Sequence, residues 1–86
     1  MNEVMYKELA TVFERTKREL ESPLVLTGMC AEDVDDYEMN IVYFVSAPDD
    51  TEDVVTEMHN MEWRMQRSSF NNIFVMPTPR PNALDD

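Results

Sequence analysis

The first twenty residues alternate apolar and polar positions with the period of a helix. Apolar or small side chains recur on one helical face, at Met5, Leu9, Val12, Phe13, Thr16 and Leu20. Glu3 lies in the first turn and basic residues lie near the last, an order that complements the helix dipole. The pattern predicts an amphipathic helix over residues 2–21. It ends at Ser22, because Pro23 disfavours helical geometry in the residue before it.

Three later segments have the pattern of strands. Residues 24–26 form a short apolar run, and residues 73–76 form another that prolines close. The clearest strand is 38–47, whose apolar side chains fall on both faces: Met39, Ile41, Tyr43 and Val45 on one, Val42 and Phe44 on the other. Apolar side chains on both faces predict a central strand.

The segment 51–67 is compatible with two structures. As a helix, it places four apolar side chains on one face and acidic residues at its N-terminus: Val54, Met58, Met61 and Met65 form the face. As strands, Val54-Val55-Thr56 is β-prone, and Met61, Trp63 and Met65 alternate with polar residues. The helix accounts for more residues, and we prefer it. Residues 30–37 predict a turn or a single acidic helical turn.

These elements predict an α+β fold. The N-terminal helix packs on a small, mainly antiparallel β-sheet, with a second helix or extra strands in residues 51–67. Eighty-six residues allow one domain, which we place at residues 1–78. We expect the proline-containing, acidic tail at 79–86 to be disordered.

Charge is distributed unevenly along the chain. The segment from Glu19 to Trp63 carries thirteen carboxylates and no Lys or Arg, in a chain of net charge −11. Such a single-sign field attracts cationic partners and repels nucleic acid and anionic membranes. We therefore expect a basic protein partner, no direct contact with nucleic acid and no membrane contact. A second interpretation stays open, in which the acidity only keeps the protein soluble.

Residues that carry catalytic or metal chemistry are few. The chain has one His, one Cys and one Gly, too few for a zinc site, a Cys-His pair of recognisable context or a glycine-rich phosphate loop. We expect no catalytic residues, no metal and no cofactor. Cys30 cannot form an internal disulfide, and the first residues lack the apolar run of a secretion signal. We therefore expect a cytoplasmic protein.

Methionine is unusually frequent, with eight in the chain. Thioether side chains fill irregular gaps in a core, and they also form adaptable surfaces that accept a partner's side chain. The core interpretation is preferred for Met58, Met61 and Met65. Trp63 is compatible with either a core position or an interface anchor.

The stretch Glu21–Leu26 followed by Glu32–Asp36 resembles the uracil-DNA glycosylase inhibitors of phages and mobile elements, which are also short acidic chains. Asn40–Val45 with Thr51–Asp53 aligns with the next strand and acidic turn of that family. The resemblance implies a strand bearing the Glu-Ser pair, then an acidic helix, then an antiparallel sheet. It also implies a protein that mimics DNA and blocks the enzyme's DNA-binding groove.

The resemblance assigns site residues. It implies that Glu21 and Ser22 contact the glycosylase's DNA-binding surface, and that an acidic run occupies its basic groove: Glu32, Asp33, Asp35 and Asp36, to which we add Glu38. It further implies an apolar pocket for the side chain that the enzyme wedges into DNA, here Leu26, Val34, Val42 and Met58. Two alternatives remain: an acidic inhibitor of another host nuclease or defence protein, and a homodimeric structural or adaptor module. We expect a monomer or a weak homodimer.

Overall fold

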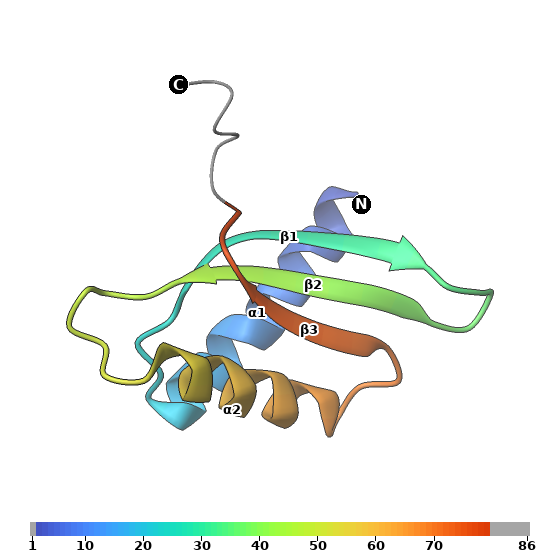
Figure 1. Cartoon of the computed structure of the whole chain (residues 1–86). Helices are drawn as coiled ribbons and strands as arrows, with labels where there is room; N and C mark the ends of the chain where they lie inside the picture. The colour runs from blue at the N-terminus through green and yellow to red at the C-terminus, as the bar shows by residue number, and fades with distance from the viewer. Residues whose placement is uncertain (1, 80–86) are drawn as a thin grey trace.

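The computed structural model describes residues 2–79 and contains two helices and three strands. In chain order they are α1 (Glu3–Leu20), β1 (Val25–Asp33), β2 (Met39–Ser46), α2 (Val54–Gln66) and β3 (Asn72–Pro77). This arrangement confirms the α+β class (Figure 1). The predicted disordered tail lies outside the described residues from position 80 onward.

The three strands form a mixed sheet in the order β1-β2-β3, so β2 is central as predicted. β1 and β2 are antiparallel, whereas β2 and β3 are parallel. The prediction of a mainly antiparallel sheet was therefore wrong for one of the two pairings. The reason is α2, which carries the chain back along the sheet, so that β3 starts at the same end as β2.

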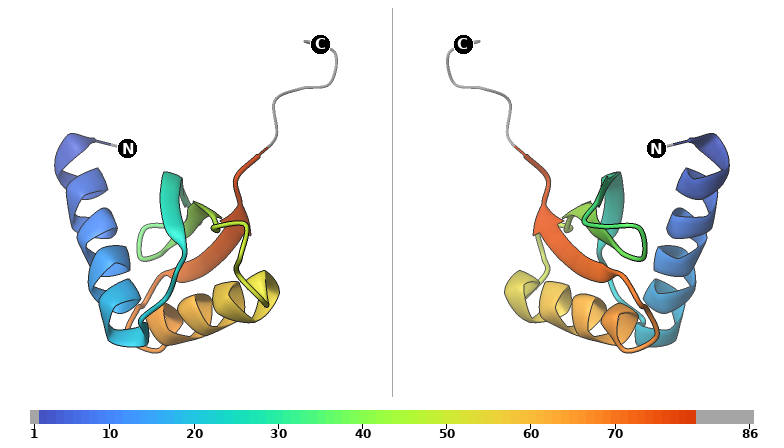
Figure 2. Two further views of the ribbon diagram at one scale, coloured as in Figure 1. Left: turned by 90° about the vertical axis from the view of Figure 1, so that its left-hand side faces the viewer. Right: turned by 90° about the vertical axis from the view of Figure 1, so that its right-hand side faces the viewer.

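Both helices lie on one side of the sheet. Figure 2 shows α2 below the strands and α1 upright beside them, so the two helix axes point in clearly different directions. Within residues 2–79 no helix covers the opposite face of the sheet, which we call the open face. The fold thus has two layers, one of helices and one of strands.

Side-chain caps fix the start of each helix. Asn2 accepts a hydrogen bond from the amide of Met5 at 2.8 Å, and Asp53 accepts from the amide of Thr56 at 3.0 Å. Each cap satisfies an amide that has no partner within its own helix. α1 ends at Glu21, which adopts the left-handed conformation (φ 52°, ψ 42°) and turns the chain toward Pro23.

The helix interpretation of residues 51–67 is confirmed. Met61 and Met65 are buried, and Val54 and Met58 on the same face of α2 are half-buried. The face that packs on the sheet is the one that the apolar spacing predicted. Trp63 is 67% exposed and is therefore a surface residue rather than part of the core.

β1 is much longer than the predicted strand at 24–26. Residues 30–33 belong to this strand, and the prediction of a turn or a helical turn there was wrong; only residues after Asp33 form the turn. A register shift between Leu26 and Gly28 is the physical reason. A β-bulge inserts one residue and so reverses the apolar alternation, which hides the second half of the strand from a pattern search.

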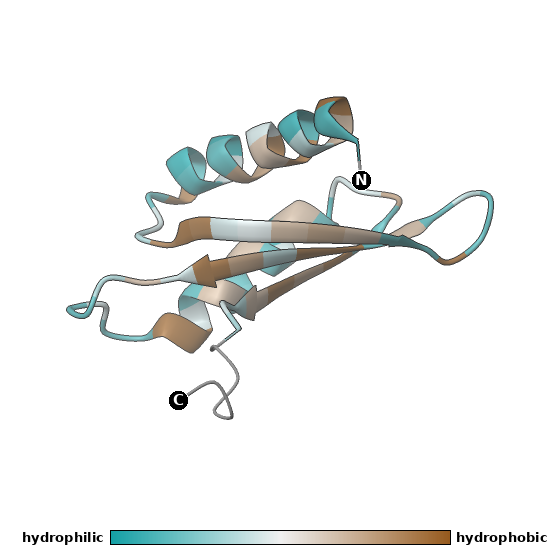
Figure 3. Ribbon diagram, turned by 90° about the horizontal axis from the view of Figure 1, so that it is seen from above, coloured by the Kyte–Doolittle hydropathy of each residue, from teal (hydrophilic) through white to brown (hydrophobic). Residues whose placement is uncertain are grey.

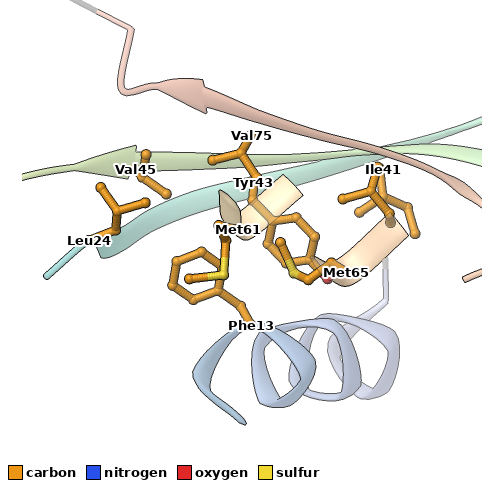
Figure 4. Packing of buried hydrophobic residues seen from close by; sticks show 9 residues of the cluster. Phe13, Leu24, Ile41, Tyr43, Val45, Met61, Met65 and Val75 are labelled. Carbon is orange, nitrogen blue, oxygen red and sulfur yellow. The ribbon is translucent and has the colours of Figure 1, made fainter. Parts of the chain in front are cut away.

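The core is centred on Tyr43. Its ring stacks on Phe13 of α1 with centroids 5.6 Å apart, and its hydroxyl donates to the carbonyl of Leu9 at 3.0 Å. Figure 4 shows how the side chains around it converge from both helices and two strands. The buried apolar set is Phe13, Leu24, Ile41, Tyr43, Val45, Met61, Met65, Ile73 and Val75. Tyr43 thus joins the central strand to α1 by both apolar packing and a hydrogen bond.

The outer edge of β3 is closed by side chains of α2. Glu62 accepts from the amide of Val75 at 2.9 Å, and Gln66 accepts from the amide of Ile73 at 2.8 Å. Unpaired amides on an edge strand are a template for pairing with another chain. Two of these amides are satisfied here within the same molecule.

Within the described residues, no helix is long and apolar enough to cross a membrane.

The environment of Tyr43 predicts a change in stability at alkaline pH. Burial raises the pKa of Tyr43 to about 12. In the unfolded chain the pKa of a tyrosine is about 10. Below that pH the contribution of Tyr43 to the free energy of unfolding is fully present, and it is lost as the pH rises from about 10 toward 12. We expect Tyr43→Phe to be less stable by about 1 kcal/mol near pH 8, because the bond to Leu9 is lost. Between about pH 10 and 12 the wild type should lose about 2 to 3 kcal/mol of its free energy of unfolding through ionisation of Tyr43, and Tyr43→Phe should not show this loss.

The measurement is the free energy of unfolding from urea titrations at several pH values between 8 and 12. Tyr37→Phe is the matched control, because it removes the same hydroxyl from a side chain that is 92% exposed. Equal alkaline losses in the wild type and Tyr43→Phe would contradict the assignment.

Candidate partner-binding surface

The cations of the fold are confined to the helices and one turn. Among residues 2–79 they are Lys7, Arg15, Lys17, Arg18 and Arg64 within the helices, and Arg67, which caps the C-terminus of α2 at the start of the α2–β3 turn. The helices also carry acidic residues, so their charge is mixed, whereas the strands, the β1–β2 turn and the β2–α2 loop contain no Lys or Arg. Figure 3 shows hydrophobic colours along the strands and hydrophilic colours in the loops beyond both of their ends.

One acidic group lies at the end of the sheet where β1 turns into β2, which we call the hairpin end. Its carboxylates are those of the predicted run: Glu32, Asp33, Asp35, Asp36 and Glu38. The backbone closes the turn through the amide of Val34, which donates to the carbonyl of Glu38 at 3.0 Å. The structure therefore brings these five predicted residues together.

Asp35 has a structural role within this turn. Its Oδ1 atom accepts from the amides of Tyr37 at 2.8 Å and Glu38 at 3.0 Å. An aspartate that bonds amides two and three residues ahead stabilises the turn conformation. Asp36 makes no side-chain hydrogen bond within the described part of the chain, so its carboxylate faces solvent.

Exposed aromatic side chains accompany the carboxylates at the hairpin end. Tyr37 at the hairpin tip is 92% exposed, and Phe70 in the α2–β3 turn is 95% exposed. Asn71 ties this turn to the hairpin, because its Oδ1 atom accepts from the amide of Met39 at 2.9 Å. Exposed aromatics beside charges are typical of protein–protein interfaces. The sequence analysis singled out neither residue, although Tyr37 lies in the acidic segment 30–37, where a turn was one of the two predictions.

A second acidic group occupies the β2–α2 loop at the opposite end of the sheet, the loop end. It consists of Asp49, Asp50, Glu52 and Asp53. Asp53 caps α2, and the hydrogen bonds it accepts from Thr56 lower the pKa of its carboxyl. The carboxylates of the other three are exposed to solvent. The acidic residues thus form two groups rather than one continuous line.

Glu21 and Ser22 lie at the loop end, away from the predicted acidic run. A shallow cleft lined by Pro23 and the residues around Asp50 to Glu57 places this segment beside the loop. The nine residues of β1 separate it from the hairpin by about 30 Å. Glu21 is exposed, whereas Ser22 is buried and its Oγ atom accepts from the amide of Leu24 at 3.2 Å. The Ser22 hydroxyl therefore stabilises the chain turn.

The four residues predicted as an apolar pocket do not meet. Leu26 and Met58 pack against the core between sheet and helices, Val42 lies on the open face, and Val34 is exposed in the hairpin. Neighbours along a strand point to opposite faces, and Ile41 and Tyr43 on either side of Val42 are buried in the core. The pocket prediction was wrong because it joined residues from both faces of the sheet.

The open face of the sheet carries exposed apolar side chains, although not the four that were predicted as a pocket. Strand pairing sets two apolar rows across it: Cys30, Val42 and Phe74 in one, and Gly28, Phe44 and Met76 in the other. A side chain at Gly28 would meet the Phe44 ring at 3.9 Å, so this ring extends over the glycine. Phe74 is 41% exposed and Met76 is 46% exposed. The signal was present in the sequence, where Phe74 and Met76 alternate with Ile73 and Val75.

A cleft between the two helices is basic. Its volume is about 600 Å³, and it is lined by Val12, Arg15, Thr16, Glu19, Arg64, Arg67 and Ser68. Arg64 is already paired, because it donates to Glu19 at 3.1 Å. Among residues 2–79 there is no group of three or more His, Cys, Asp or Glu side chains that could hold a metal ion.

The fold implied by the resemblance differs from this one in two respects. Residues 30–37 form a strand and a turn instead of an acidic helix, and the sheet is mixed instead of antiparallel. Comparisons with protein-family models, curated proteins and solved structures give no significant match.

The two neighbouring aspartates of the hairpin predict a contrast. Asp35→Ala should lower the melting temperature, because the amides of Tyr37 and Glu38 lose their acceptor, a change of about 1 kcal/mol. Asp36→Ala removes the same charge without a hydrogen bond and should leave the melting temperature within a degree or two. Thermal unfolding followed by circular dichroism measures both. A larger loss for Asp36→Ala would contradict the assigned roles.

Proposed function

We propose that the protein is a non-enzymatic acidic inhibitor that blocks the basic DNA-binding groove of a DNA-binding enzyme in the cytoplasm. The observation that carries the proposal is the division of charge between the layers. All cations among residues 2–79 lie on the helices or, for Arg67, at the C-cap of α2, while the strands, the hairpin turn and the β2–α2 loop present carboxylates at both ends of the sheet and no cation. A surface of this kind attracts the basic groove that would otherwise hold phosphates.

The spacing of the acidic groups defines what they can contact. The eight residues of β2 hold the hairpin end and the loop end apart by about 26 Å. Duplex DNA carries one charge per about 1.7 Å of its axis, so two compact groups replace phosphates at two places rather than along a whole strand. The protein would therefore contact two basic patches of its partner, with its helices turned away.

Uracil-DNA glycosylase is the most specific partner within this proposal. The support is the resemblance of the segments at Glu21–Leu26 and Glu32–Asp36 to the inhibitors of that enzyme. Another host nuclease or a defence protein with a basic groove would satisfy the same electrostatics. The carboxylates offered to either partner are the solvent-facing ones at the hairpin and loop ends.

Charge removal at the hairpin end tests the proposal. Asp33→Asn/Asp36→Asn should lower the rate of association with the enzyme and flatten the dependence of that rate on salt, because rim charges act mainly on encounter. Glu8→Gln/Glu14→Gln is the matched control, since it removes two exposed carboxylates from α1. The control should change the rate far less. Stopped-flow or surface-based kinetics at two ionic strengths give these rates, and an activity assay gives inhibition.

Three results would count against parts of the proposal. Failure of the folded wild type to inhibit uracil-DNA glycosylase at micromolar concentration would discard that partner alone. Binding of the protein to duplex DNA in a gel-shift assay would contradict a protein partner. Equal effects of the α1 and hairpin variants would show that only net charge matters and would refute the assigned surface.

A further inference from the structure

The open face combines an apolar centre with acidic ends. Its two apolar rows lie in the middle of the strands, and a polar row at the hairpin end follows them: Glu32, Asn40 and Asn72. The amide of Asn72 donates to the side chain of Asn40 at 2.8 Å, so these two amides are mutually satisfied. Glu32 at the edge of this row is exposed.

The sequence of surfaces along the strands is therefore acidic, apolar, acidic. At the hairpin end Glu32 belongs to this face and Asp36 lies in the turn beyond it, whereas Asp33 pairs with Met39 on the side of the helices. At the loop end the β2–α2 loop carries Asp49 and Asp50, and the hydroxyls of Thr27 and Thr78 lie 2.6 Å apart between this loop and the apolar rows. Among residues 2–79 the strands, the hairpin turn and the β2–α2 loop contain no Lys or Arg. An occupant that covers the apolar rows must meet negative charge on both sides.

A second copy of the chain fits this pattern poorly. In the aligned packing of two sheets, a two-fold axis along the strands brings hairpin end onto hairpin end. An axis across the strands brings the hairpin end of one copy onto the loop end of the other. Both arrangements set carboxylates against carboxylates, and such like-charge contacts cost free energy.

We propose that the open face is the docking site for a basic amphipathic helix of a partner protein. The inference rests on the proposed function, because it assumes a basic partner, and it adds the contact surface and the shape of the bound segment. The partner's apolar side chains would cover Val42, Phe44 and Phe74. Its Lys or Arg side chains would reach the carboxylates beyond the two ends of the strands.

The dimensions of the face agree with a helix. Three strands at about 4.8 Å spacing form a surface about as wide as one helix with its side chains, which measures about 10 Å. The two apolar rows are separated by two residues along each strand, about 7 Å, which is a little more than one helical turn. A helix that also reaches both acidic ends must span about 26 Å, which takes about 18 residues. The partner segment is thus expected to be apolar on one side of its middle turns and basic toward both ends.

The test uses a synthetic peptide of about 18 residues as the probe. It carries Leu at i, i+3, i+4 and i+7 in its middle and Lys toward both ends, and binding is measured by fluorescence anisotropy. We expect Phe74→Ser/Met76→Ser to weaken binding at least tenfold. The matched control is Val55→Ser/Trp63→Ser, which removes two exposed apolar side chains from the outer side of α2. The control should bind the peptide as the wild type does.

Two additions keep the test decisive. Gly28→Lys puts bulk and a positive charge on the same face without removing any side chain, and the nearest obstacle is the Phe44 ring at 3.9 Å. It should weaken binding even if the double variant fails to fold. A peptide of the same composition with Leu and Lys redistributed, so that no apolar face forms, should bind weakly.

The outcomes separate this inference from the proposed function. Equal binding of the peptide by the wild type and by both open-face variants would overturn the docking site, while enzyme inhibition could still hold. A failure to inhibit uracil-DNA glycosylase, although the amphipathic peptide binds as expected, would discard that partner from the proposed function and leave the docking site. Suppose that the wild type is a homodimer in a size measurement and that Phe74→Ser/Met76→Ser is not. A second copy of the chain would then occupy the open face, which would overturn the inference.

Discussion

The central strand β2 has apolar side chains on both of its faces, but the chain supplies helices for only one. Ile41, Tyr43 and Val45 are buried beneath α1 and α2. Val42 and Phe44 point the other way, toward a face that neither helix reaches. With both helices on the same side, residues 2–79 contain no further layer that covers the second face. The buried core and the exposed apolar surface therefore both follow from the apolar side chains on the two faces of β2.

This constraint makes the treatment of the sheet edges important. An open apolar face beside unpaired strand edges would favour uncontrolled association. Glu62 and Gln66 satisfy two outward amides of β3, and Thr78 beyond its end donates to the carbonyl of Val45 at 2.8 Å. One side of α2 thus contributes methionines to the core, and the adjacent side of the same helix contributes polar acceptors to the edge of β3. The edge next to α2 is closed, whereas β1 forms the other edge of the sheet.

The periodic elements were predictable from the sequence, and the contacts between them were not. The helix over residues 2–21, the strand at 38–47 and the apolar side of α2 follow from spacing alone, because each buries one regular set of side chains. The full length of β1 was not predicted, because the bulge near Gly28 breaks the alternation of apolar and polar residues. The parallel pairing of β3 depends on where α2 delivers the chain, which local spacing does not encode.

The candidate surface was predictable only in part, for a related reason. Glu32 to Glu38 are adjacent in the sequence and remain adjacent in a hairpin. Glu21 and Ser22 are only a strand's length away along the chain, but an extended strand sends them to the other end of the sheet. Ser22 also shows that a polar residue in a suggestive motif can serve the backbone, since its hydroxyl accepts from Leu24. Charge segregation was visible in the sequence, whereas its division into two groups required the fold.

The distance between those groups decides how selective such a surface can be. The screening length is about 8 Å at physiological ionic strength, well below the separation of about 26 Å between the hairpin end and the loop end. The two groups therefore act independently on any partner in close contact. A partner with the same total positive charge in a single patch gains from only one of them. The apolar rows lie between the two acidic groups. A partner can therefore contact both groups and the apolar rows only when its cations are about as far apart as the two ends of the strands. Selectivity then depends on spacing as well as on net charge.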